Sequence, residues 1–396
     1  MTRPVAGHAG FFRPLTVALL CGALAWTWQF LTVTRNYGGN WTALYMAGSA
    51  MPIPPALLPG TYRFPGTGFD GQTYRIIAHD PMFRKGYSAY CDDARLRYRR
   101  ILVPALAFLI AAGQDRFIDQ TYIAVILLFI SAGVYWTSRW ATLHGRDALW
   151  GALFLLAPGT LTSIDRLLVD GPCTALFAAL ALCLALGRKR AVWVVLAAAA
   201  LTRETAILLP AGVCLFYVVR KQAATAVFYA SSALPLLIWS LVVVRHTPPS
   251  HAVSLFARPV YGLFMRLWTP TPYPFSPPMN HFIQFVGFVS ACGHLLAFAL
   301  ALWWFFRTKQ RGAIEYVALL FVAMGLMLGR QDHLQESYGY ARPISPLYLF
   351  LFLRFLSDRV RVMIAPMLMV SAQILLFFAY QAMGILGLKP PRGTAS

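Results

Sequence analysis

The sequence predicts an all-α protein that crosses a membrane many times, built as one integral membrane domain over residues 1–396. Two observations indicate this fold class. Hydrophobic residues make up 58% of the chain and charged residues only 12%, and long apolar runs recur from one end to the other. A soluble domain of this size needs far more charged surface. No separate soluble domain is therefore expected.

Nine apolar runs have the composition of membrane-spanning helices. Most of them have the roughly 17 to 25 residues that cross about 30 Å of hydrocarbon. In chain order they are Leu15 to Val33, Thr121 to Thr137, Ala148 to Ile164, Pro172 to Leu186, Thr225 to Val244, Phe282 to Phe306, Ile314 to Leu328, Pro343 to Phe355 and Met363 to Met383. The first run follows Arg3 and Arg13 and lacks a small-residue cleavage site, so it is expected to stay in place as a span.

Two further segments do not fit a single span. The run from Ala191 to Val219 has Arg203 and Glu204 at its middle, and a charged pair halfway across a bilayer would be costly. It is therefore expected to form two short helices that turn at this pair. The run from Ile101 to Gly113 is too short to cross comfortably and predicts a half-helix at the interface. The expected total is about eleven transmembrane helices.

Basic residues in short loops predict the orientation. Clusters that the positive-inside rule places in the cytoplasm are Arg139/Arg146, Arg188-Lys189-Arg190, Arg220-Lys221, Arg307/Lys309/Arg311 and Arg354/Arg359/Arg361. The N-terminus is then cytoplasmic and the C-terminus external. The alternate loops face the outside, and the largest is residues 34–100, which is expected to carry interfacial helices.

The formal net charge of +20 is only partly explained by these cytoplasmic clusters. Nine of the 34 Lys and Arg residues lie in the external loop of residues 34–100. A basic external face suggests anionic ligands, most simply lipid phosphates. The alternative is that long loops escape the charge rule and merely touch lipid headgroups.

Several function classes have no sequence signal. There is no Walker A or G-x-G-x-x-G element, which argues against a nucleotide-driven pump. The six cysteines form no C-x-x-C pair, so structural zinc is not expected. No nucleic-acid partner is expected either. Membrane lipids are the expected surroundings.

The segment Phe69-Asp70-Gly71-Gln72-Thr73-Tyr74 is the richest in candidate chemistry. It predicts an amphipathic helix with Tyr74, Ile77 and Ala78 on one face, ended by Pro81. Asp70 stands where a capping residue would. It can equally serve as a general base that accepts a proton from an attacking hydroxyl. The two roles are compatible.

This segment, the run Tyr98-Arg99-Arg100-Ile101-Leu102-Val103-Pro104 and the turn Leu201-Thr202-Arg203-Glu204-Thr205 together resemble bacterial membrane glycosyltransferases of the GT-C superfamily, in particular the PIG-V-type mannosyltransferase group. The chain departs from that pattern in having no Trp before Asp70 and no Phe-Phe-Pro-Leu-Tyr-Pro run. The resemblance implies a GT-C-like fold, a polyprenyl-phosphate-linked sugar donor and a catalytic role for Asp70.

Three arginines are candidate ligands of the donor phosphate, because guanidinium groups hold phosphate oxygens bidentately. Arg99 and Arg100 precede the half-helix, where the alternative is a basic stop at the headgroups. Arg203 pairs in sequence with Glu204, and a charged pair at membrane depth indicates function. A purely structural ion pair is the alternative.

Other polar residues are candidates to support the site. His79 and Asp80 follow Asp70 closely and are expected to line the same cavity, together with Tyr74. Asp165 and Asp170 flank an external turn, where they can cap helices or supply a second carboxylate or a metal ligand. The late loop of residues 331–342 contains an Asp-His pair and two tyrosines and reads either as a sugar-binding or as a solvated loop.

The function expected from these features is inverting transfer of a hexosyl or mannosyl unit. The sugar would pass from a lipid-phosphate carrier to a glycan, lipid or protein acceptor at the outer face of a bacterial inner or plasma membrane. A divalent metal ion is compatible with this chemistry and not required, since arginines can supply the same charge. A polytopic transporter or lipid-linked glycan flippase is the alternative, although the paired halves of such proteins are not visible.

Overall fold

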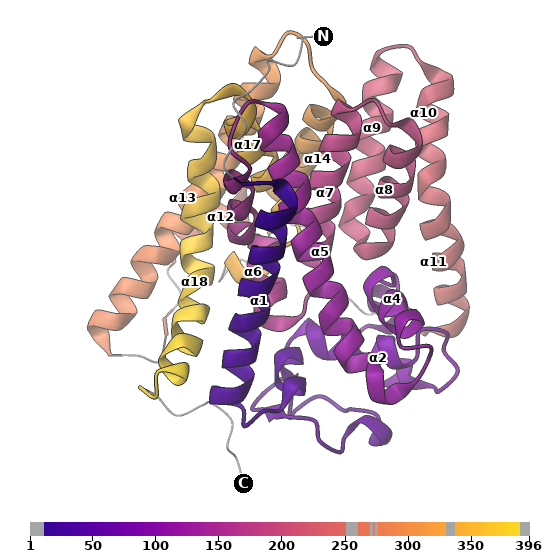
Figure 1. The fold of residues 1–396 in the computed structure, drawn as a ribbon, viewed down its shortest axis with the longest axis vertical. Coiled ribbons are helices and arrows are strands. Elements are labelled where there is room, and N and C mark those ends of the chain that lie inside the picture. The colour runs from indigo at the N-terminus through magenta and orange to yellow at the C-terminus, as the bar shows by residue number, and fades with distance from the viewer. Residues whose placement is uncertain (1–11, 251–259, 270–271, 274–275, 330–336, 389–396) are drawn as a thin grey trace.

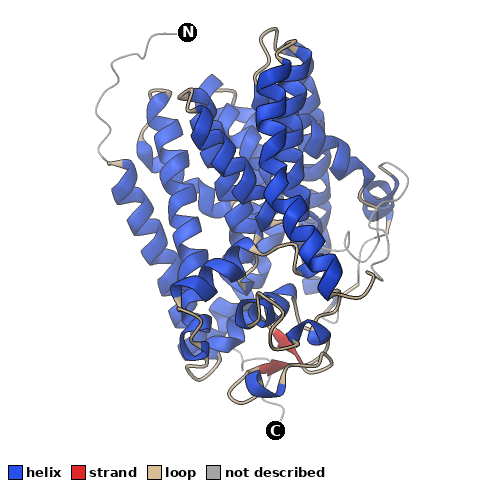
Figure 2. Ribbon diagram, turned by 90° about the vertical axis from the view of Figure 1, so that its right-hand side faces the viewer, coloured by secondary structure: helices blue, strands red, loops and turns tan. Residues whose placement is uncertain are grey.

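The structure is a computed structural model, and it describes residues 12–250, 260–269, 272–273, 276–329 and 337–388. Helices make up almost all of the regular structure (Figures 1 and 2). Two strands of two residues each, β1 (Ala47–Gly48) and β2 (Arg63–Phe64), pair in parallel. The all-α class predicted from composition is confirmed for the described part of the chain.

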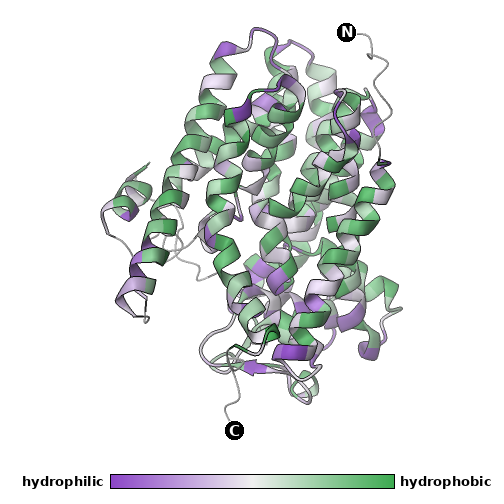
Figure 3. Cartoon of the chain, turned by 60° about the vertical axis from the view of Figure 1, so that its left-hand side comes forward, coloured by the Kyte–Doolittle hydropathy of each residue, from purple (hydrophilic) through white to green (hydrophobic). Residues whose placement is uncertain are grey.

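Five helical segments of the described chain are long and apolar enough to cross a membrane. They are α1 (Pro14–Asn36), α5 (Asp115–Leu143), Ala223–His246, α13 (Pro277–Arg307) and Arg361–Ile385. A sixth arises if η4 (Ala148–Leu156) and α6 (Pro158–Arg166), which meet at 64°, form one bent span. Hydrophobic residues run along these helices while hydrophilic ones gather toward their ends (Figure 3). These are the features of a membrane protein.

The remaining apolar runs form shorter helices, which are α7 (Asp170–Ala185), α8 (Lys189–Thr202), η5 (Glu204–Ile207), α9 (Leu208–Val219), α14 (Ala313–Met327) and α17 (Ser345–Asp358). Two of the five long segments consist of consecutive elements: Ala223–His246 comprises α10 (Ala223–Ala230), η6 (Ser231–Ala233) and α11 (Leu234–His246), and Arg361–Ile385 comprises η7 (Arg361–Ile364) and α18 (Ala365–Ile385). Two further short helices are α12 (Tyr261–Trp268) and α16 (Ser337–Tyr340). Length alone therefore supports five or six spans, fewer than the eleven expected.

The helix break expected at Arg203 is confirmed. Helix α8 ends at Thr202, Arg203 is extended (φ −156°, ψ 142°), and η5 begins at Glu204. Helices α8 and α9 pack against each other. The expected half-helix is also present as α4 (Leu102–Ile110), whose nine residues rise only about 13 Å.

The loops divide between two ends of the helical bundle as the basic clusters predict. At one end, the Arg146 Nε atom donates to the Leu356 carbonyl (3.4 Å), and Arg220 donates to the Arg311 carbonyl (3.4 Å). At the other end lies the first large loop (Figure 1). Asn36, the last residue of α1, donates there to the Gln381 carbonyl near the end of α18.

The first large loop is folded over the bundle end. It contains η1 (Trp41–Tyr45), η2 (Pro55–Leu57), α2 (Asp70–His79), η3 (Tyr87–Tyr90) and α3 (Ala94–Arg97). The expected helix is present as α2, and it has no exposed face, because every residue from Gly71 to His79 is buried. Helices α4 and α5 and the η1 turn cover it. A Cβ at Gly71 would lie 2.5 Å from the Arg166 carbonyl oxygen, so the helix start fits only without a side chain there.

Candidate functional site

Asp70 lies at the centre of an arginine cluster. Its Oδ2 atom is 2.9 Å from an Nη1 atom of Arg97, 3.3 Å from Nη1 of Arg342 and 3.8 Å from Nη1 of Arg100. The Asp70 side chain is 19% exposed, whereas the side chains of Arg100 and Arg342 are 5% and 8% exposed. A partly accessible carboxylate is therefore held by largely buried guanidinium groups.

Asp70 does not cap helix α2. The capping position is Phe69, Asp70 is the first helical residue, and the helix has no side-chain cap hydrogen bond. A carboxylate in the first turn still interacts favourably with the positive end of the helix dipole. The side chain turns instead to the arginines, so its placement depends on their charge.

Arg100 is fixed by two elements at once. Its Nε and Nη2 atoms donate to the two carboxylate oxygens of Glu204 at 2.6 and 2.7 Å. Its Nη1 atom donates to the Tyr74 hydroxyl at 2.5 Å. The residues that sequence analysis placed in the first loop and at the hairpin turn are thus joined in one cluster.

Asp170 extends this cluster to the start of α7. Arg203 forms an ion pair with Asp170, and the Arg342 Nη1 atom lies 3.9 Å from the other carboxylate oxygen. Asp170 is 1% exposed, so a carboxylate there requires the two guanidinium groups. Arg342 therefore links Asp170 to Asp70, and through them Arg203 belongs to the same site.

Arg97 is shared between two carboxylates. Its Nη2 atom is 2.6 Å from the Asp92 Oδ2 atom, while its Nη1 atom contacts Asp70. With Arg97, the cluster balances four arginines against four carboxylates. The arginines are Arg97, Arg100, Arg203 and Arg342, and the carboxylates are Asp70, Asp92, Asp170 and Glu204. The formal charge of the closed cluster is zero.

The arginines determine the ionisation of Asp70. Burial alone would raise the pKa of this carboxyl. The positive charges of Arg97, Arg342 and Arg100, in that order of effect, outweigh burial and hold the pKa of Asp70 well below its usual range. Asp70 is therefore a carboxylate at neutral pH, and a weak base while the arginines surround it.

Three buried polar atoms of the cluster have no hydrogen-bond partner among the described residues. They are Nε of Arg203, Nε of Arg342 and Oδ2 of Asp170. Buried polar groups normally have partners. Two of these atoms are N–H donors, so an anionic ligand would find donors here that the protein itself does not use.

A second group borders the cluster. The Arg166 guanidinium carbon lies 3.5 Å from the Phe69 ring centroid and 4.2 Å from the Tyr338 centroid. Asp165 accepts a hydrogen bond from the Tyr338 hydroxyl at 3.0 Å and pairs with Arg166. Asp165 lies inside α6 and does not cap it. These two partners engage the Asp165 carboxylate.

His79 and Asp80, which were expected to line a cavity with Asp70, have other partners in the structure. His79 lies between the carboxylates of Asp115 (3.0 Å) and Asp119 (3.2 Å). Asp80 accepts from the backbone N–H groups of Arg84 and Tyr87. These residues stand at the far end of α2, about 13 Å along the helix from its first residue.

Arg99 also stays outside the cluster. No hydrogen bond or ion pair of its side chain occurs within the described residues, and its Nε atom is buried without a partner. Only Arg100 of the expected Arg99/Arg100 pair reaches Asp70. The sequence analysis missed Arg97, Arg342 and Asp92 as site residues. The high density of arginine in residues 95–100 was a signal for Arg97. Arg342 ends the late loop of residues 331–342, which was considered as a sugar-binding loop without this arginine being singled out.

The carboxylates of the described residues are mostly engaged by cations. No group of three or more His, Cys, Asp or Glu side chains in the described ranges is arranged to hold a metal ion. The Asp-His pair of the late loop, Asp332 and His333, lies outside the described residues. Charge at this site is thus supplied by arginine.

Comparison of the chain with known protein families, with curated proteins and with solved structures finds no match in any of the three.

Proposed function

We propose that this protein is an integral membrane glycosyltransferase of the GT-C type. It transfers a sugar from a polyprenyl-phosphate carrier to an acceptor at the outer face of a bacterial plasma membrane. The observation that supports this most strongly is the partly exposed carboxylate of Asp70 within 4 Å of three arginines. A base beside phosphate ligands is the pair of functions that this transfer requires.

The chemistry is a single displacement. An acceptor hydroxyl oxygen attacks the anomeric carbon of the donor sugar, and the hydroxyl proton passes to an Oδ atom of Asp70. The bond between that carbon and the phosphate oxygen breaks with inversion. The lipid phosphate leaves with the electron pair, and guanidinium groups stabilise its charge.

Donor binding activates Asp70 in this proposal. A carboxyl whose pKa is held far below its usual range accepts protons poorly. A phosphate bound by Arg97 and Arg342 competes with Asp70 for their charge. The pKa of Asp70 then rises toward its ordinary value, so the base becomes effective only when the donor is in place.

Arg100 and Arg203 have different roles in this scheme. Arg100 uses two nitrogens on Glu204, so its main role is to position the loop and the hairpin. Arg203 holds Asp170 and keeps an Nε donor without a protein partner. That donor, with the equivalent atom of Arg342, is available to phosphate.

The proposed topology has eleven crossings, with a cytoplasmic N-terminus and an external C-terminus. The crossings are α1, α5, the bent η4–α6 pair, α7, α8, η5–α9, α10–α11, α13, α14, α17 and α18. The 14 residues of α8 rise only about 21 Å. The Arg203 turn therefore lies below the outer membrane surface, where a lipid phosphate can approach it.

The test uses purified protein in liposomes that contain a radiolabelled polyprenyl-phosphate sugar and a lipid or glycan acceptor fraction. The proposal expects label in the acceptor and release of polyprenyl phosphate. A transporter or flippase would move the labelled carrier across the bilayer without releasing it. That result would replace the glycosyltransferase proposal.

A further inference from the structure

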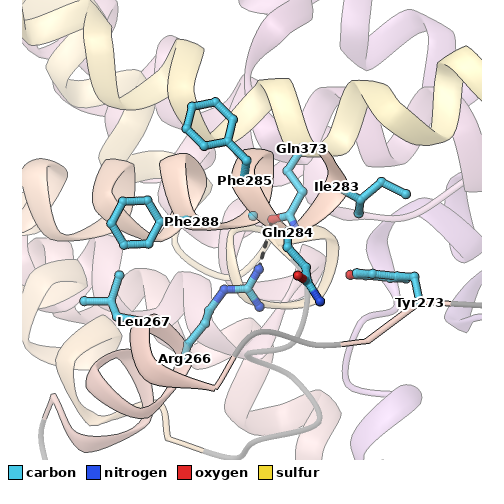
Figure 4. A pocket seen from close by; sticks show the side chains of 9 residues that line it. Arg266, Leu267, Tyr273, Ile283, Gln284, Phe285, Phe288 and Gln373 are labelled. Carbon is cyan, nitrogen blue, oxygen red and sulfur yellow. Dashed lines mark hydrogen bonds between the residues drawn. The ribbon is translucent and has the colours of Figure 1, made fainter. Parts of the chain in front are cut away.

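A pocket of about 230 Å³ lies between α12, α13 and α18, and its polar side chains have partners within the protein. Figure 4 shows the Arg266 guanidinium group pointing toward Gln373, and its Nη2 atom donates to the Gln373 side-chain oxygen at 3.2 Å. None of the lining residues belongs to the cluster around Asp70. Buried polar atoms that still lack a hydrogen bond occur in that cluster, which therefore has the greater capacity to hold a substrate.

The carboxylate of Asp170 has one oxygen that the described residues leave without a hydrogen bond. Oδ1 pairs with Arg203, whereas Oδ2 is buried and accepts from none of them. The Arg342 Nη1 atom lies 3.9 Å from Oδ2, beyond hydrogen-bond distance. A buried acceptor in this state is costly, and a ligand that supplies a donor removes the cost.

The backbone around Asp170 is held from two sides. The Gly171 N–H donates to the Ser163 hydroxyl at 2.7 Å, which joins the start of α7 to α6. The Thr174 hydroxyl donates to the Asp170 carbonyl oxygen at 2.7 Å. Since Arg203 also holds Oδ1, Asp170 has little freedom to turn Oδ2 toward another protein group. An acceptor fixed in this way favours one ligand position.

The free atoms beside Asp170 have a definite chemical complement. The unused Nε–H groups of Arg203 and Arg342 match the oxygens of a phosphate. Asp170 Oδ2 repels such an oxygen, because both carry negative charge, and is matched by a neutral O–H group. A ligand that satisfies all three atoms therefore combines a phosphate with a hydroxyl close to it.

In a glycosyl phosphate, the hydroxyl closest to the phosphate is the 2-hydroxyl, on the carbon next to the anomeric carbon. We propose that Asp170 accepts a hydrogen bond from this 2-hydroxyl and so selects the sugar of the donor. The inference rests on the proposed function and names the group that its donor site recognises. Sites built to hydrogen-bond a substrate hydroxyl reject an analogue that lacks it, because the buried partner is then left unpaired.

Arg342 connects Asp170 to the general base. Its Nη1 atom lies 3.3 Å from Asp70 Oδ2 and 3.9 Å from Asp170 Oδ2, so both carboxylates face one guanidinium nitrogen. When Arg342 turns to the donor phosphate, it leaves both oxygens to the substrate. Asp70 then receives the proton of the acceptor hydroxyl, and Asp170 receives the hydrogen bond of the 2-hydroxyl.

The test compares donors with the wild-type protein in liposomes. They are polyprenyl-phosphate mannose and glucose, their common 2-deoxy analogue, and the 3-deoxy analogue of each as the matched control. Loss of a hydrogen bond to a charged acceptor should lower kcat/KM for the 2-deoxy donor about tenfold to hundredfold relative to the better parent. The 2-deoxy sugar is the more reactive in the displacement itself, because it lacks an electron-withdrawing hydroxyl beside the reacting carbon. Slower transfer therefore measures recognition.

The outcomes separate this inference from the proposed function. Transfer of the 2-deoxy donor as fast as its parent would overturn the role of Asp170 and leave glycosyl transfer standing. An equal loss with the 3-deoxy donors would also overturn it, because recognition would then not centre on the 2-hydroxyl. Transfer of neither parent hexose would contradict the proposed hexosyl transfer, and this inference with it.

A pair of variants assigns the recognition to Asp170 through a ratio of rates, which does not depend on the amount of folded protein. In Asp170→Asn the ratio of parent to 2-deoxy transfer should fall about tenfold, because a neutral acceptor forms the weaker hydrogen bond. Asp92→Asn removes another carboxylate of the cluster, which is 39% exposed and needs no substrate partner, and should leave the ratio unchanged. A wild-type ratio in Asp170→Asn, or the same fall in Asp92→Asn, would contradict the assignment.

Discussion

Arg100 and Glu204 form a bidentate ion pair across 104 residues of sequence, with both nitrogen–oxygen distances at or below 2.7 Å. The pair joins the loop that carries Asp70 to the turn between α8 and α9. The same guanidinium group reaches the Tyr74 hydroxyl and lies 3.8 Å from Asp70. The pair thus holds together the two parts of the chain that form the site.

Removing one member of this pair should cost more than removing both. Arg100→Gln or Glu204→Gln alone leaves a charge without its partner, which is strongly destabilising in a buried place. The double variant leaves neither charge. The two single-variant losses of unfolding free energy should therefore add up to about 1 to 3 kcal/mol more than the loss in the double variant. The free energy of unfolding in mixed micelles measures this. Strict additivity would show that the pair contributes no coupling.

Variants of Arg203 distinguish a role in binding phosphate from a purely structural role. Arg203→Ala leaves the buried Asp170 without its closest cation, so stability and transfer should both fall. Arg203→Lys should rescue stability in part and transfer less, because a lysine lacks the planar fork. The double variant Arg203→Ala/Asp170→Asn removes the unpaired charge and should restore thermal stability without restoring transfer. Full transfer by this double variant would make Arg203 purely structural.

Acid should destabilise the wild type more steeply than Asp70→Asn. The pKa of Asp70 is depressed in the folded protein, and its unfolded value is about 3.9. The unfolded chain binds this proton first, so the stability contributed by Asp70 is complete above about pH 4 and is lost as the pH falls below it. The pKa of Asp92 is lowered too, but Asp92 is present in both proteins.

The measurement is the free energy of unfolding between about pH 6 and pH 3. The difference between the two curves belongs to Asp70 and can reach about 1.4 kcal/mol per pH unit. Parallel curves would show that the arginines do not stabilise its ionised form.

The topology predicts which positions face the cytoplasm. Tags after Met1 and within Arg307–Arg311 should report the cytoplasm, and tags near Gly60 and Asp332 the outside, because the positive-inside rule retains the basic clusters. Paired alkaline phosphatase and green fluorescent protein fusions measure this. A cytoplasmic report at Gly60 would invert the orientation and place Asp70 on the wrong face.

The hairpin turn shows what the sequence can predict. Arg203 and Glu204 interrupt an apolar run, and the charge penalty alone is enough to place a break there. The half-helix α4 follows in the same way from a run too short to span. The break and the half-helix both follow from local composition, which can be read from the sequence without knowledge of tertiary contacts.

The partners of Asp70 could not be predicted in the same way. Arg342 is 272 residues away in sequence and approaches only because the chain segment before α17 packs near α2. His79 shows the converse, since it is near Asp70 in sequence yet points to Asp115 and Asp119. Side-chain pairing of this kind is decided by tertiary packing.

Replacement of Asp70 by Asn and by Glu tests its proposed role as the general base. Asn can replace a capping aspartate with little loss, but Asp70 does not cap its helix. Asn will therefore also weaken the hold of the arginines, and transfer must be measured per folded molecule. Glu keeps the charge that the arginines need but moves the carboxylate.

Transfer from a lipid-linked sugar by folded protein in liposomes is the most direct measurement. Asp70→Asn should lower it by the roughly 10² to 10⁴-fold typical of a lost general base, and Asp70→Glu should preserve stability while transfer still falls. Asp147→Asn, which keeps the cap hydrogen bond to the Leu149 N–H at the opposite end of the bundle, should transfer as wild type does. Near-normal transfer by folded Asp70→Asn would show that Asp70 is not the general base.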